Sequence, residues 1–315
     1  MQCPSAGEPY RNFLAEPLAE VQRSNGRESA MTPNRVALVT GAAGGLGTAI
    51  AVGLAKAGFR LALLDRAALP PAHPAFDIPE SDRMAETVDI ADFRAVEDAV
   101  GRLAAGLGEP AALVNAAGLG PPFVDPGIFE RPVDLTTVEA DRWRRLFDVN
   151  VAGAFHAARA VAGPMIARGW GRIVNVTTNL DSMLRPGVAS YGASKAALEA
   201  LSAAWAAELA GTGVTVNVVI PGGPADTPMV PDLPGLDRAS LVPAAAMAPP
   251  VAWLCSAAAD AVTGRRLVAS GWVDPPAGAA AETVGSPIGW PQLAGTDRTV
   301  PMAGAFDRPV RASDS

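Results

Sequence analysis

The sequence is poor in the residues that build zinc sites and disulfide frameworks. Its 315 residues include only two histidines and two cysteines, Cys3 and Cys255, which lie near opposite ends of the chain. No CxxC pair is present. Structural zinc sites usually need four cysteine or histidine ligands, and small disulfide-rich folds need several cysteine pairs. We therefore expect neither, and the composition is typical of a protein in a reducing cytoplasm.

The sequence also lacks an apolar leader and a long apolar run that could span a membrane. The first thirty residues contain four glutamates, which neither a signal peptide nor a transit peptide favours. The longest uncharged run, residues 239–259, is rich in alanine and is interrupted by three prolines. The net charge of −7 and the pI near 5.0 would repel nucleic acids and anionic membranes. Small molecules and other proteins remain as partners.

Hydrophobic residues make up 49% of the chain, enough for a sizeable core, and from Arg35 onward they follow a regular pattern. Short apolar runs alternate with longer, alanine-rich amphipathic segments, which predicts a doubly wound α/β fold with a parallel sheet covered by helices on both faces. Four prolines between residues 70 and 79 predict that the second crossover is mostly loop. The expected strands are 35–40, 60–65, 87–90, 112–115, 171–178, 214–220 and 265–270, and the expected helices are 46–58, 91–108, 138–169 and 190–211.

The pattern divides the chain into three parts. We predict a flexible N-terminal extension at 1–33, a single domain at 34–272, and an irregular C-terminal tail at 273–315 that is ordered only where it packs on something.

A glycine-rich turn follows the first predicted strand and opens the first predicted helix. In TGAAGGLG, residues 40–47, three glycines allow a tight turn and a close approach to a pyrophosphate, which a helix N-terminus stabilises. Asp65 ends the second strand, where a carboxylate can accept hydrogen bonds from a ribose and repel a 2′-phosphate. The pattern therefore favours NAD, although Arg66 beside it could hold the phosphate of NADP.

The two tyrosines and two lysines of the chain provide one pair at helical spacing, in SYGASKAAL at 190–198. Tyr191 and Lys195 would share one face of a helix. The ammonium group should lower the pKa of the phenol from its usual value near 10, with a nicotinamide cation adding to the field. We interpret the pair as an acid/base device.

Four motifs in order resemble the classical branch of the short-chain dehydrogenase/reductase family over residues 34–272. They are TGAAGGLG, VDI at 88–90, NAAG at 115–118 and YGASK at 191–195. The resemblance implies a Rossmann fold and hydride transfer between a nicotinamide cofactor and a secondary alcohol or ketone. It implies the catalytic residues Asn150, Thr178, Tyr191 and Lys195. It also implies the cofactor-binding residues Gly41, Gly45, Leu46, Gly47, Asp65, Asp89, Ile90, Asn115, Ala116, Gly118, Tyr191, Lys195, Pro221, Gly222 and Thr227.

Two positions depart from the family pattern. Thr178 stands where the family has a serine that positions the substrate oxygen, and Ser182 in the same loop is a competing candidate. Four residues separate Gly222 from Thr227, where the family has three. The resemblance further implies that Asn150 holds a water linking Lys195 to solvent.

Other readings remain open from the sequence. The enzyme could be an NADPH-dependent 3-oxoacyl reductase, or the chain could be a non-catalytic, cofactor-binding regulator with the same fold. The alanine-rich helices at 138–169 and 190–210 predict a homotetramer or homodimer. The apolar, proline-rich loops at 119–136 and 229–243 could line a pocket for a hydrophobic or medium-sized substrate. His73, in the proline-rich crossover, has no partner that the sequence identifies.

Overall fold

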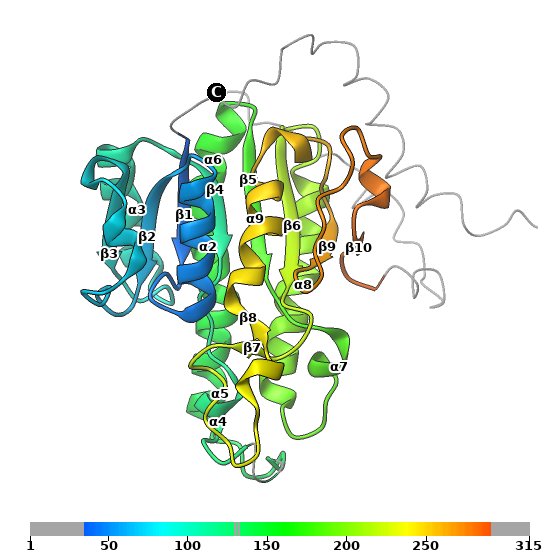
Figure 1. Cartoon of the computed structure of the whole chain (residues 1–315). Helices are drawn as coiled ribbons and strands as arrows, with labels where there is room; N and C mark the ends of the chain where they lie inside the picture. Colours follow the sequence, from blue (N-terminus) through cyan, green and yellow to red (C-terminus); the bar gives the residue numbers. More distant parts are fainter. Residues whose placement is uncertain (1–34, 129–130, 132, 291–315) are drawn as a thin grey trace, which may run out of the picture. The chain divides into compact units, whose positions relative to one another are not determined.

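The computed structural model describes residues 35–128, 131 and 133–290, and the part up to residue 288 forms one compact unit (Figure 1). Within it, eight strands form one sheet in the order β10-β9-β6-β5-β4-β1-β2-β3. All neighbours are parallel except β10 and β9. The predicted doubly wound α/β fold is confirmed. The strands are β1 Val36–Thr40, β2 Arg60–Asp65, β3 Arg83–Thr87, β4 Pro110–Asn115, β5 Gly171–Val176, β6 Val214–Ile220, β9 Arg265–Val268 and β10 Ser286–Pro287.

Helices cover both faces of the sheet, as a parallel sheet requires. Helices α2 and α9 pack on one face, and α3, α6 and α8 pack on the other (Figure 1). Three shorter helices lie in the connections after β4 and β5. The bounds are α2 Gly45–Lys56, α3 Phe93–Leu107, α4 Pro121–Val124, α5 Ala140–Phe147, α6 Gly153–Ala167, α7 Leu180–Met183, α8 Ala189–Glu208 and α9 Ala248–Leu254.

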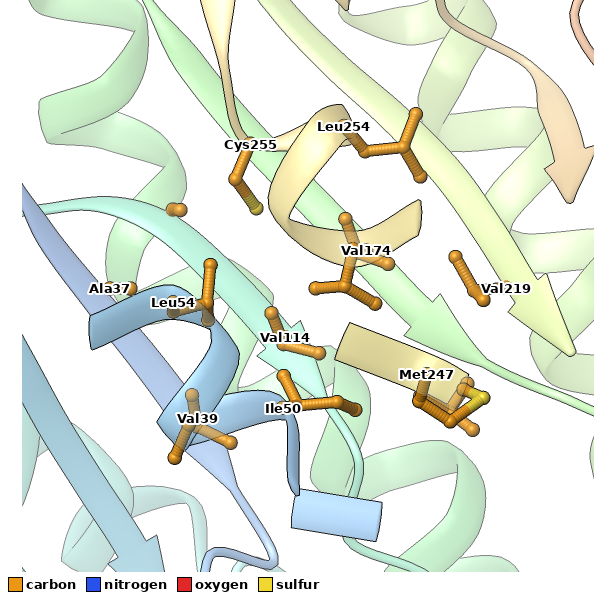
Figure 2. Close-up of a cluster of buried hydrophobic side chains, with 14 of the residues drawn as sticks. Ala37, Val39, Ile50, Leu54, Val114, Val174, Val219, Met247, Leu254 and Cys255 are labelled. Carbon is orange, nitrogen blue, oxygen red and sulfur yellow. The ribbon is translucent and has the colours of Figure 1, made fainter. Parts of the chain in front are cut away.

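The two faces of the sheet have separate apolar cores, because successive strand residues point to opposite sides. Ala37 and Val39 of β1 contact the cluster formed with α2 and α9, shown in Figure 2, where Cys255 is also buried. Val36 and Leu38 belong to the cluster under α3 and α6. The central strands β1, β4, β5 and β6 are buried along their whole length, which explains their nearly continuous apolar sequences.

Strand β3 differs from the prediction of a strand at 87–90. It runs from Arg83 to Thr87 and pairs with β2 at the edge of the sheet. An edge strand needs few apolar residues, so the apolar Val88 and Ile90 gave a misleading signal. Both are buried, but beyond the strand's end, in the core under α3 and α6. The crossover before β3 contains only the short 3₁₀ turns Pro74–Asp77 and Glu80–Asp82, as its prolines predicted.

The predicted helix at 138–169 is divided into α5 and α6 by a turn of π-helix, Asp148–Ala152. Such turns place one extra residue in a helix and often occur at functional sites. Asn150 lies at the centre of this turn.

The chain continues to pack on the sheet beyond residue 272, where we predicted that an irregular tail begins. Val284 and Ile288 are buried, and β10 pairs antiparallel with β9. The Arg265 guanidinium holds the segment by donating hydrogen bonds to the Val284 and Gly285 carbonyls, both at 2.8 Å. The two-residue strand is too short for a periodic signal in the sequence. The predicted extension at 1–33 and the part of the tail after residue 290 lie outside the described residues.

Among the described residues, no helix is both long and apolar enough to cross a membrane. The same residues contain no group of three or more histidine, cysteine, aspartate or glutamate side chains placed to hold a metal ion.

Candidate cofactor and catalytic site

The predicted site residues follow the carboxyl ends of several parallel strands, and therefore gather along one edge of the sheet. The glycine-rich turn follows β1, Asp65 ends β2, and residues 88–90 follow β3. The NAAG segment overlaps the end of β4, Thr178 follows β5, and Pro221 follows β6.

The turn between β1 and α2 fits an anion. Gly41 has a φ of +70°, and a Cβ atom there would lie 2.6 Å from the Ala117 backbone, so only glycine is accommodated. The first turn of α2 contains no acidic residue, and its N-cap, Gly44, has no side chain to occupy the free N–H groups. A pyrophosphate can accept these N–H groups and is stabilised by the helix dipole. Gly45, Leu46 and Gly47 form this first turn.

Asp65 connects the end of β2 to the glycine-rich turn. One carboxylate oxygen accepts a hydrogen bond from the Ala43 N–H at 2.9 Å, and the other accepts one from Ala67 at 3.0 Å. Arg66 is exposed beside it. The carboxylate therefore lies next to the expected phosphate position, where it can receive ribose hydroxyls.

The NAAG segment, at the end of β4, is hydrogen-bonded to the start of the glycine-rich turn after β1. The Ala117 N–H donates to the Thr40 hydroxyl at 3.2 Å. The Asn115 amide donates to Asn175 Oδ1 at 2.9 Å and is buried, so this side chain joins β4 to β5. Gly118 faces Lys195 and Asn150, because a Cβ there would lie 3.3 Å from both Lys195 Nζ and Asn150 Oδ1. Ala116 lies between these positions, partly buried against the core under α2.

The segment after β3 is tied to the helices beside it. Asp89 accepts a hydrogen bond from Arg145 at 2.5 Å and another from the Ala91 N–H at 3.0 Å. Burial disfavours the charged carboxylate, but these hydrogen bonds and the positive charges of Arg145 and Arg66 outweigh it and lower the pKa of Asp89. His156 donates to the Ile90 carbonyl at 2.8 Å, and Ile90 is buried.

Tyr191 lies in the first turn of α8, which begins at Ala189, and Lys195 lies in the second. Lys195 is buried and its ammonium donates to the Val176 carbonyl at 2.9 Å. Burial lowers the pKa of Lys195 to about 8. Burial raises the pKa of the Tyr191 phenol to about 12, and a hydrogen bond with the Thr178 side chain lowers it only in part. The expected lowering of the Tyr191 pKa by Lys195 is therefore not found in the protein alone, where burial raises this pKa and the Thr178 side chain is the group that lowers it.

The segment at Thr177 and Thr178 is hydrogen-bonded to an ion pair between Glu199 and Arg266, which the sequence did not reveal. Glu199 of α8 accepts from the Thr177 hydroxyl at 2.9 Å and from Arg266 at 3.2 Å. Arg266 of β9 also donates to the Thr178 carbonyl at 2.5 Å. Ser182 lies in α7, where its N–H is capped by the Asn179 side chain at 2.8 Å. The structure thus brings Thr178 to the tyrosine.

Asn150 bridges three parts of the site. Its Oδ1 accepts from the Leu119 N–H at 2.7 Å, and its Nδ2 donates to the Leu119 carbonyl and to Ser194 Oγ, both at 3.0 Å. Ser194 in turn donates to the Tyr191 carbonyl at 2.8 Å. The π-turn aims this side chain at α8, and its amide orients the loop after β4 against the tyrosine helix.

The loop after β6 reaches back to the glycine-rich turn. Gly222 follows Pro221 with a φ of +95°. A Cβ on Gly45 would lie 2.7 Å from Thr227 Cγ2, so Thr227 packs on the start of α2 despite the extra residue in its motif. Arg238 fastens the segment through its ion pair with Asp226 at 2.6 Å. The two ends of residues 225–243 are joined by a two-stranded sheet of β7 Ala225–Asp226 and β8 Val242–Pro243.

Together, a glycine-rich turn at a helix N-terminus and a tyrosine–lysine pair on the same sheet edge define a dinucleotide-binding oxidoreductase. A family model described as short chain dehydrogenase matches residues 35–234. The chain is also 33% identical over 252 residues to the cis-4-hydroxycyclohexanecarboxylate dehydrogenase of Sinomonas cyclohexanicum, an alignment covering 75% of this chain and 95% of that protein. The chain belongs to the short-chain dehydrogenase family.

Solved structures agree with this assignment. A gluconate 5-dehydrogenase from Burkholderia cenocepacia, in complex with NADP and tartrate, is 29% identical and matches with a TM-score of 0.66 over 77% of this chain and 97% of that one. A 3-ketoacyl-(acyl-carrier-protein) reductase from Brucella melitensis, complexed with NADH, is 27% identical and matches with a TM-score of 0.64 over 75% and 96%. The chain is therefore an oxidoreductase that acts on CH–OH or C=O groups with a nicotinamide cofactor.

Proposed function

We propose that this protein is an NAD-dependent dehydrogenase that interconverts a secondary alcohol and a ketone. The observation that carries the proposal is the placement of Tyr191 on α8 with buried Lys195 one helical turn away and Thr178 acting on its phenol, on the sheet edge that carries the glycine-rich turn. This arrangement offers two hydroxyl groups to one substrate oxygen and a proton relay behind them.

The bound cofactor would supply a hydride acceptor or donor and, when oxidised, a positive ring. Tyr191 is protonated in the protein alone and can give its proton to the ketone oxygen. To take the proton of the alcohol it must first lose its own toward Lys195, and the positive ring of the oxidised cofactor would favour that loss. Because burial lowers the pKa of Lys195 to about 8, the ammonium can pass a proton onward near neutral pH. Thr178 orients the substrate oxygen. Asn150 joins the loop at Leu119 to α8 through its side-chain hydrogen bonds.

The remaining cofactor assignments follow from position. The helix N-terminus at Gly45, Leu46 and Gly47 would hold the pyrophosphate. Asp65 would accept the ribose hydroxyls, and the segments after β3, β4 and β6 would line the rest of the cofactor. Those segments contribute Asp89, Ile90, Asn115, Ala116, Gly118, Pro221, Gly222 and Thr227.

The first test is turnover with a panel of secondary alcohols, followed by the absorbance of the reduced cofactor, with NAD and NADP compared at equal concentration. We expect faster turnover with NAD because the Asp65 carboxylate repels a 2′-phosphate. Asp65→Ala should narrow the preference for NAD about tenfold or more, through the loss of one charge repulsion and of ribose hydrogen bonds.

The matched variant for this test is Asp65→Asn, which keeps an oxygen for the Ala43 N–H and removes the charge. A wild-type enzyme already faster with NADP would contradict the cofactor proposal. That result would favour the second candidate, an NADPH-dependent 3-oxoacyl reductase. The likeness to the Brucella melitensis 3-ketoacyl reductase supports the substrate class of this candidate, and the cofactor in that structure is NADH. Purified protein that binds the cofactor but turns over no alcohol or ketone would favour the non-catalytic regulator.

We also propose a homodimer or homotetramer. Helices α5 and α6 expose large apolar side chains that the described residues leave uncovered, namely Trp143, Phe155 and Ile166, each 42–43% exposed. Such residues on neighbouring helices are typical of a protein interface. Light scattering at micromolar concentration should therefore give at least twice the mass of one chain, and a monomer would contradict the proposal.

A further inference from the structure

The second crossover folds beneath the glycine-rich turn, although its prolines prevent a helix. His73 lies at the N-terminus of the 3₁₀ turn Pro74–Asp77, and its side chain is buried with 4% exposed. Ala75, two residues later, is fully buried in the core next to α2. A polar ring is thus placed in a largely apolar environment, where its hydrogen bonds must be satisfied.

Each ring nitrogen of His73 has a partner. Nδ1 accepts the Ala75 N–H at 3.1 Å, so Nδ1 carries no proton and the neutral ring holds its proton on Nε2. Nε2 lies 3.0 Å from the Ala42 carbonyl and 3.0 Å from Thr48 Oγ1. Since a carbonyl oxygen can only accept, His73 donates to Ala42.

The Ala42 carbonyl therefore receives two donors. Thr48 of α2 donates to it at 2.9 Å, and His73 donates from the crossover. Holding this carbonyl fixes the plane of the peptide between Ala42 and Ala43, because the peptide unit is rigid. The N–H of that peptide is the one that Asp65 accepts.

We propose that His73 is a positioning residue for the cofactor: by holding the Ala42 carbonyl it fixes the Ala42–Ala43 peptide, whose N–H positions the Asp65 carboxylate that would accept the ribose hydroxyls. The proposal deepens the proposed function, since it rests on binding of a nicotinamide cofactor at this turn. The proline-rich crossover then contributes to cofactor affinity through one side chain, without touching the cofactor.

Two substitutions separate the two hydrogen bonds of the ring. His73→Asn keeps an acceptor for the Ala75 N–H but is too short to donate to Ala42, whereas His73→Gln keeps a donor near the Nε2 position. Calorimetric titration with NAD should show the Kd rise about five- to tenfold in His73→Asn, the scale of one lost hydrogen bond, and about twofold or less in His73→Gln. The kcat at saturating NAD should stay within about twofold in both, because the turn does not touch the reacting atoms.

Thr48→Val tests the same carbonyl from α2 without altering the crossover, and it keeps the test decisive if a His73 variant fails to fold. It should weaken NAD binding in the same direction. An unchanged Kd in His73→Asn and Thr48→Val would overturn the proposal, and so would an equal loss in His73→Gln and His73→Asn. Wild-type protein that binds neither NAD nor NADP would instead overturn the proposed function.

Discussion

Replacing Tyr191 by phenylalanine should abolish turnover and leave the affinity for NAD within about threefold. The variant removes only the phenolic oxygen, which we propose takes and gives the substrate proton. The aromatic ring stays in place on α8. Steady-state kcat and a calorimetric Kd for NAD measure the two effects separately.

Lys195→Ala is the contrasting variant and should weaken both turnover and NAD binding. Its side chain is buried beside the cofactor-binding edge and donates to the Val176 carbonyl, so its loss disturbs more than proton transfer. If Tyr191→Phe retained more than about a tenth of the wild-type kcat, another group would have to be the acid/base, since loss of a general acid or base usually costs 10²–10⁴-fold.

The second large effect is expected at Thr178. Thr178→Ala should lower kcat/KM by about 10² or more, because it removes a hydrogen bond to an oxygen whose charge grows in the transition state. Thr178→Ser should keep most of the activity, since the hydroxyl remains and only a methyl group is lost. The serine hydroxyl would stand where the Thr178 hydroxyl acts on the Tyr191 phenol.

Ser182→Ala completes the test, because Ser182 is the competing hydroxyl in the same connection. The capped position of its N–H in α7 supports a mild effect for this variant. A severe loss at Ser182 with a mild one at Thr178 would move the role to the serine. Mild losses at both would show that the reaction needs no side-chain hydroxyl from this loop.

The sequence predicted those parts of the fold that depend on neighbouring residues along the chain. The buried strands, the glycine-rich turn and the order of the motifs could all be found by periodicity and spacing. Edge strand β3 could not, because an edge needs few apolar residues and Val88 and Ile90 beyond it are buried for another reason. The part of the tail that packs on the sheet could not be predicted, because β10 has only two residues.

The parts of the site that the sequence missed depend on contacts between distant segments. His73 reaches Ala42 across 31 positions, and Arg266 reaches Glu199 across 67. The pKa of Tyr191 was misjudged because helical spacing shows the neighbouring lysine but not how deeply the fold buries the phenol. Burial of a titratable group is a property of the whole tertiary structure.

The two outer strands of the sheet determine how it can and cannot associate with other chains. On one side, β10 ends in Pro287, which has no N–H to offer a further strand. On the other side, β3 carries Arg83 and Glu86, and Glu86 is fixed by a two-point ion pair with Arg102. Charges and prolines at such positions oppose strand addition and the fibrous aggregation that follows from it. The described sheet is therefore protected at both edges against templated aggregation.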